Sequence, residues 1–97
     1  MSQCAPLFIF RLYIVGGAQN SVLAGANLRA LCRTYLPDQH QIEVLDVFCE
    51  QKRALEDAIF MTPTLLKLAP AHACRIVGTL SQTRDVLLAL GLDHHLP

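Results

Sequence analysis

The chain has 97 residues, of which 53% are hydrophobic and 16% are charged. A chain of this length forms one domain, residues 1–97, with a modest core, so part of its apolar surface is expected to lie in interfaces. Eight basic residues balance eight acidic ones, which argues against nucleic acid or an anionic membrane surface as a partner.

The first apolar segment, Leu7–Val15, predicts a strand covered on both faces, because aliphatic, β-branched and aromatic residues fill it almost without a break. Arg11 interrupts the segment, which is also too short to span a bilayer, and no secretory leader is recognisable, so we expect a cytoplasmic protein. A glycine pair ends this strand, and Asn20 or Ser21 is expected to cap a helix that stops before Pro37.

The middle of the chain predicts a second strand over Gln41–Phe48 and a surface helix over Glu50–Phe60. That helix would place Leu55, Ala58 and Ile59 on its apolar face. Two strands joined by a helix of the first helix's length should run parallel.

Two further strands, Thr64–Ala69 and Cys74–Val77, predict a hairpin. A last helix is expected to begin after a cap at Ser81, to end near Leu90 and to stop at Gly91. The predicted order is therefore strand, helix, strand, helix, strand, strand, helix, which is the order of thioredoxin-like α/β domains.

Pro63 lies where a thioredoxin-like domain has its cis-proline loop. An arbitrary proline is preceded by a cis bond in about 5–6% of cases. The topological position of Pro63 raises that expectation considerably.

The cysteines do not indicate thiol chemistry. A thioredoxin-like oxidoreductase needs a thiolate at the start of its first helix with a second thiol nearby, and segment 16–21 contains no cysteine. Cys4, Cys32, Cys49 and Cys74 include no Cys-x-x-Cys pair, so we expect reduced thiols used as small apolar residues. A thiol oxidoreductase or redox sensor that uses Cys49 is retained as the alternative function.

The histidines do not predict a metal site. His72 with Cys74, and His94 with His95, could supply ligands, yet neither pair belongs to a recognised ligand spacing. The glycine pair is not part of a phosphate-binding motif either. We therefore expect no metal and no cofactor.

Four segments are specific in combination. They are LYIVGGAQNSV at Leu12–Val22, DV at Asp46, EDAIFMTPTLLK at Glu56–Lys67 and RIVGTLS at Arg75–Ser81. With these segments the chain resembles the KaiB family of circadian-clock proteins over nearly its whole length.

The resemblance implies a non-catalytic adaptor that can adopt two folds. KaiB proteins rest as dimers or tetramers whose second half has the order strand, helix, helix, strand, and a rarer monomer adopts the thioredoxin-like order. That monomer binds the N-terminal ATPase ring of the KaiC clock kinase, sequesters KaiA and displaces the output kinase SasA. The resemblance thus predicts a βαβ N-terminal half and a C-terminal half ordered either αββα or βααβ. Partner and subunit contacts of a few kcal/mol would decide between the two.

Several positions differ from the better-known clock members of the family. Leu23 and Ala26 replace basic residues of the first helix, and Ala58 replaces a lysine, which weakens electrostatic docking on the ATPase. Gln41 and Glu43 replace a small residue and a lysine, which argues against KaiA as a partner.

A Gly-x-Asp pattern associated with fold balance is also replaced, by Ala89, Leu90 and Gly91. Because alanine favours a helix over glycine by about 1 kcal/mol, a helix ending near Leu90 is favoured here.

These observations predict a divergent KaiB paralogue that serves a KaiC-type ATPase, with a SasA-type kinase as a possible competitor. The predicted partner contacts are Lys52, Glu56, Phe60 and Lys67. The predicted fold-balance positions are Pro63, Ala89 and Gly91. A free-standing sensor domain like the N-terminal part of SasA is a further alternative, but it would need an attached kinase.

Overall fold

The computed structural model describes residues 6–93. The first half consists of β1 (Phe8–Ile14), α1 (Gln19–Tyr35) and β2 (His40–Asp46). The second half consists of α2 (Gln51–Glu56), β3 (Thr64–Ala69), β4 (Cys74–Val77) and α3 (Thr83–Leu90). The predicted thioredoxin-like order is therefore confirmed, with the second half arranged as αββα.

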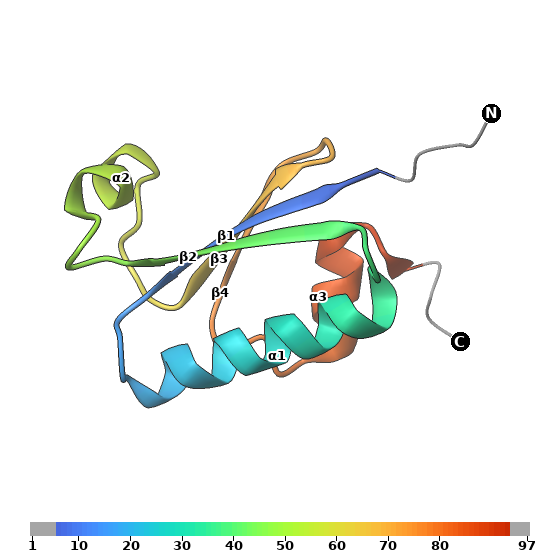
Figure 1. Cartoon of the computed structure of the whole chain (residues 1–97), viewed down its shortest axis with the longest axis horizontal. Helices are drawn as coiled ribbons and strands as arrows, with labels where there is room; N and C mark the ends of the chain where they lie inside the picture. The colour runs from blue at the N-terminus through green and yellow to red at the C-terminus, as the bar shows by residue number, and fades with distance from the viewer. Residues whose placement is uncertain (1–5, 94–97) are drawn as a thin grey trace.

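One four-stranded sheet, in the order β2-β1-β3-β4, organises the molecule. β1 runs parallel to β2, as the intervening helix predicted, whereas β3 pairs antiparallel with both β1 and β4. Figure 1 shows α1 and α3 together on one side of this sheet, with α2 at one end and apart from them.

Alternating residues of β1 divide the core between the two faces of the sheet. Phe8, Phe10 and Leu12 are buried against the side chains of α1 and α3. On the opposite face, Tyr13 is fully buried in a smaller cluster with Leu45, Ala54 and Leu66. The second cluster is where α2 docks.

The predicted helix caps are wrong. α1 begins after Ala18, and no side chain caps it. Because the helix starts earlier than expected, Ser21 lies inside its first turn, where the buried hydroxyl accepts a hydrogen bond from the Val15 amide at 3.0 Å. α3 likewise begins after Gln82 without a side-chain cap, and the hydroxyl of Ser81 lies 2.9 Å from that of Thr79 instead.

The predicted end of the second strand is also too late. β2 stops at Asp46, because a turn begins there. The Asp46 carboxylate accepts the amides of Phe48 at 2.8 Å and of Gly16 at 2.9 Å, so it ties together the loops that follow β2 and β1.

The helix predicted over Glu50–Phe60 ends four residues early, at Glu56. Ala58 adopts a left-handed conformation with φ 55°, and the Ile59 amide donates to the Ala54 carbonyl at 2.9 Å. This six-to-one bond is the mark of a Schellman ending, which stops a helix at the left-handed residue.

The end of α3 repeats this geometry at a glycine. Gly91 has φ 78°, and the Leu92 amide donates to the Leu87 carbonyl at 2.8 Å. The prediction that Gly91 stops the last helix is confirmed.

Candidate functional site

Three of the four predicted partner contacts share one exposed region. Lys52 and Glu56 are exposed on α2, and Phe60 follows in the loop to β3 with 89% of its surface exposed. This region lies at the end of the molecule occupied by α2 in Figure 1.

Large apolar side chains extend the same region. We define the α2 surface as Phe48, Lys52, Leu55, Glu56, Phe60 and Met61, all of which are exposed. The prediction that Leu55 lies on the buried apolar face of this helix is wrong, because Leu55 is 78% exposed. The helix is only six residues long, and Ala54 is its buried residue instead. The longer helix predicted from the sequence indicated a different buried face.

Lys67, the fourth predicted contact, lies elsewhere. It is only 5% exposed, and its side chain points to the α1 and α3 side of the sheet. Its ammonium nitrogen is 3.4 Å from the Leu90 carbonyl at the end of α3 and 5.6 Å from the centre of the Phe8 ring. A cation is favoured at this end of a helix. We therefore assign Lys67 to the packing of α3 and not to the α2 surface.

The three predicted fold-balance residues do not form one site. Pro63 is buried at the start of β3 after a cis Thr62–Pro63 bond, and its carbonyl accepts the Gly78 amide at 2.9 Å. Ala89 and Gly91 are exposed at the end of α3. Pro63 thus lies between α2 and β3, whereas Ala89 and Gly91 lie at the end of the second half.

A polar network lies beneath the α2 surface. The Asp57 carboxylate accepts hydrogen bonds from Arg11 at 2.8 Å and from the Tyr13 hydroxyl at 2.5 Å. The hydrogen bond from Tyr13, together with the Arg11 guanidinium, lowers the pKa of Asp57. Burial, reinforced by the hydrogen bond to Asp57, raises the pKa of Tyr13 to about 12. Sequence reasoning missed this network, since its members are far apart along the chain.

A second ion pair joins α2 to β2. Arg53 contacts both carboxylate oxygens of Glu43 at 2.8 Å, and this bidentate contact lowers the pKa of Glu43. Arg11 Nε also lies 3.4 Å from Glu43. Glu43 on β2 is thus already engaged by two guanidinium groups of this chain.

The cysteines of the described residues are not arranged for redox chemistry. Cys32 is buried, which raises the pKa of its thiol to about 11 and makes the thiolate scarce at neutral pH. Cys49 is exposed in the loop before α2, and neither it nor Cys32 or Cys74 forms a disulfide. Nothing in this geometry favours the thiol alternative.

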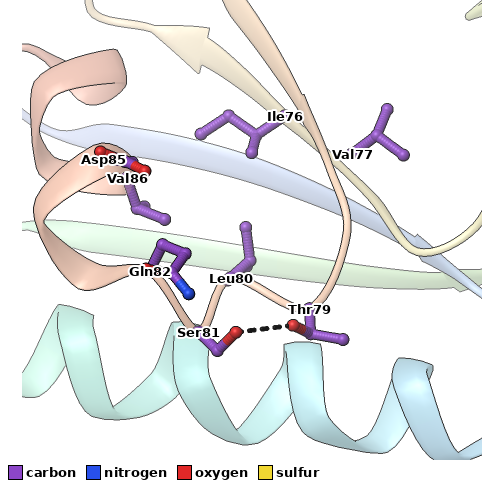
Figure 2. Close-up of a pocket in the computed structure, with 8 residues that line it drawn as sticks. All are labelled: Ile76, Val77, Thr79, Leu80, Ser81, Gln82, Asp85 and Val86. Atoms are coloured by element: carbon purple, nitrogen blue, oxygen red, sulfur yellow. Dashed lines mark hydrogen bonds between the residues drawn. The ribbon is translucent and has the colours of Figure 1, made fainter.

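A pocket of about 350 Å³ between β4 and the start of α3 carries little chemistry. Figure 2 shows the residues that line it, among which Asp85 is the one charged side chain. Across residues 6–93 no three histidine, cysteine or acidic side chains gather as metal ligands, and no helix is long and apolar enough to cross a membrane. His94 and His95 lie outside the described residues.

A family model described as the KaiB domain matches residues 11–92. The chain belongs to the KaiB family. It is 42% identical over 94 residues to the circadian clock protein KaiB3 of Synechocystis sp., with 92% of each chain covered. It is 38% identical over 85 residues to the circadian clock oscillator protein KaiB of Prochlorococcus marinus, covering 88% of this chain and 73% of that protein. The resemblance found in the sequence is confirmed.

Solved structures show the fold independently. The N-terminal domain of Synechococcus elongatus SasA matches with a TM-score of 0.74 at 15% identity, covering 100% of this chain and 93% of that one. A chloroplastic thioredoxin z matches with a TM-score of 0.74 at 13% identity, covering 91% and 80%. This KaiB-family chain therefore has the thioredoxin-like arrangement in both halves.

Proposed function

We propose that this chain is a non-catalytic adaptor of a Kai-type clock that binds the N-terminal ATPase ring of a KaiC-type kinase through the α2 surface. One observation carries the proposal: a KaiB-family chain in the thioredoxin-like arrangement exposes Phe60 almost completely beside Lys52 and Glu56. Several exposed apolar side chains with charged residues around them, as on the α2 surface, are typical of an interaction site.

The absence of redox groups at the usual place supports a binding role. The loop and first turn at 16–21 hold glycine and amide or hydroxyl side chains where a thioredoxin has its thiolate. Binding through α2 would modulate the phosphorylation or the output of the kinase without a chemical step on this chain. The site of action would be the cytoplasm.

A SasA-type kinase is a natural competitor in this account. The SasA domain and this chain have the same fold over nearly their full lengths, so both could present an equivalent surface to one ATPase. KaiA is not proposed as a partner. Glu43, which replaces a lysine on β2, is held by Arg53 and Arg11 and leaves that strand without a free basic group at this position.

The resting state is proposed to be a homodimer or homotetramer with the βααβ order in its second half. Exposed apolar side chains on α1 and β2, namely Val22, Leu23 and Val44, are consistent with subunit contacts. The arrangement described here would then be the binding-competent one.

The proposal is tested by size-exclusion chromatography with light scattering, with and without a KaiC-type ATPase and nucleotide. We expect a complex whose affinity falls about 10-fold or more for Phe60→Ala, because a central aromatic contact usually contributes that much. Leu88→Ala is the matched control, since Leu88 is 50% exposed on α3, away from α2, and should leave the affinity unchanged. Failure of the wild-type chain to bind any KaiC-type ATPase of its own cell would exclude the proposal.

A further inference from the structure

Asp57 lies in the turn that ends α2, and two side chains of β1 reach its carboxylate. Arg11 and the Tyr13 hydroxyl both donate to Oδ2, at 2.8 and 2.5 Å. Arg11 and Tyr13 are two positions apart, so they project from the same face of β1. The side chains of Arg11 and Asp57 are only 23% and 22% exposed, so water competes weakly for this ion pair.

Arg75 of β4 holds the main chain of the same turn. Its two terminal nitrogens donate to the carbonyls of Asp57 at 2.6 Å and of Ala58 at 2.9 Å. These carbonyls follow the last turn of a helix, where a cation is stabilising. We call Arg11, Tyr13, Asp57 and Arg75 together the Asp57 clamp.

Without such contacts α2 has little to hold it in place. It is six residues long and buries only Ala54 from its own sequence. A helix this short is unstable alone, so its position depends on tertiary contacts. The bidentate Arg53 to Glu43 ion pair, with side chains 35% and 51% exposed, is screened by water more than the Arg11 to Asp57 pair is.

We propose that Asp57 is a positioning residue for partner binding, which fixes Glu56 and Phe60 in the orientation that the partner recognises. This inference rests on the proposed function of the α2 surface. Glu56 precedes Asp57 directly and Phe60 follows three residues later, so a displaced turn moves both. Asp57 itself is half-buried and its carboxylate contacts two side chains of β1.

The clamp also makes the α2 surface dependent on the whole fold. Two of its members belong to β1 in the first half, whereas Arg75 belongs to the hairpin of the second half. The two strands are not neighbours, because β3 lies between them. The surface is therefore complete only when the β3–β4 hairpin is paired with β1 as described here, and a chain in another arrangement presents a different α2.

Amide hydrogen exchange on the free chain tests the positioning role. In Asp57→Asn and in Tyr13→Phe we expect exchange at residues 51–59 to accelerate about 10-fold, the effect of losing a charged hydrogen bond. Amides in the buried part of α1, near Leu28 and Cys32, should keep their wild-type rates, because they belong to the other core cluster. Asp93→Asn is the matched control, since Asp93 is exposed and lies beyond α3.

The binding measurement completes the test. Each single variant should bind the KaiC-type ATPase about 10-fold more weakly, and the double variant should be no weaker than either, because both break one unit. Tyr35→Phe is the matched control for Tyr13→Phe and should bind with wild-type affinity, since Tyr35 is not part of the clamp. Wild-type exchange rates at 51–59 in both clamp variants, or an equal acceleration in α1, would overturn the inference.

The failure of the proposed function can be told apart from the failure of this inference. If the wild-type chain binds no such ATPase, the proposed function fails, and the exchange rates still decide whether the clamp holds α2.

Discussion

At the scale of single residues, two left-handed positions end two helices with different residue types. Ala58 ends α2 with φ 55°, and Gly91 ends α3 with φ 78°. Left-handed backbone costs an L-residue roughly 1–2 kcal/mol, whereas glycine adopts it freely. The same backbone geometry is therefore strained in α2 and relaxed in α3.

Exchanging the residue types at these positions should shift stability in opposite directions. Gly91→Ala should lower the free energy of unfolding by about 1 kcal/mol, and Ala58→Gly should raise it by up to about 1 kcal/mol. A Cβ at Gly91 meets no atom within 4 Å, so the cost there is conformational and not steric. Urea unfolding followed by circular dichroism measures both, and a gain in stability for Gly91→Ala would contradict the assignment.

At the scale of elements, the coupling between β1 and α2 gives stability a defined pH dependence. The pKa of Asp57 is lowered by Tyr13 and Arg11, so its contribution is present above the pKa near 4 of an unfolded aspartate and is lost as the pH falls through the lower folded value. The pKa of Tyr13 is raised to about 12, so its contribution is present below pH 10 and is lost as the pH rises toward 12.

This dependence is measured by chemical denaturation between pH 2 and pH 12. We expect a plateau in the neutral range that falls away on the acid side through Asp57 and on the alkaline side through Tyr13. Tyr13→Phe should remove the part of the alkaline loss of stability that lies between pH 10 and 12, whereas Tyr35→Phe should retain that loss. An unchanged alkaline limb in Tyr13→Phe would contradict the assigned role of the Tyr13 hydroxyl.

Local sequence patterns predicted which helices and strands form. They predicted less well where these elements end and which distant residues are in contact. Periodicity located all seven helices and strands of the described residues, because strand and helix patterns depend on neighbours in sequence. It placed the end of α2 at Phe60 instead of Glu56. The helix ends at a left-handed alanine, which the sequence does not reveal, whereas a glycine such as Gly91 is a recognisable helix stop. Three of the predicted partner contacts, Lys52, Glu56 and Phe60, lie on the exposed α2 surface, and their role in binding stays a prediction.

The contacts that carry the further inference could not be read from the sequence. Arg11 and Tyr13 are separated from Asp57 by 46 and 44 positions, and pairing between such distant residues depends on the register of three strands. The burial of Lys67 could not be predicted for the same reason. Its register partner Phe10 faces the α1 and α3 side, so the lysine is drawn inward to the end of α3.

At the scale of the whole molecule, the two halves of the chain have different parts in the fold. The first half contributes most of the larger core cluster through β1 and α1. The second half contributes the α2 surface, and the Asp57 clamp ties that surface to β1. If a second arrangement is the more populated one at rest, the apparent affinity for the partner falls in proportion to the fraction of competent molecules.

The central claim is that the thioredoxin-like arrangement is the one that binds. Backbone chemical shifts of the isotopically labelled chain, recorded free and saturated with the N-terminal ATPase domain of a KaiC-type kinase, test it most directly. We predict helical shifts at Gln51–Glu56 and strand shifts at Thr64–Ala69 and Cys74–Val77 in the complex, whatever the free chain shows. A bound chain whose second half has the order strand, helix, helix, strand would contradict the account.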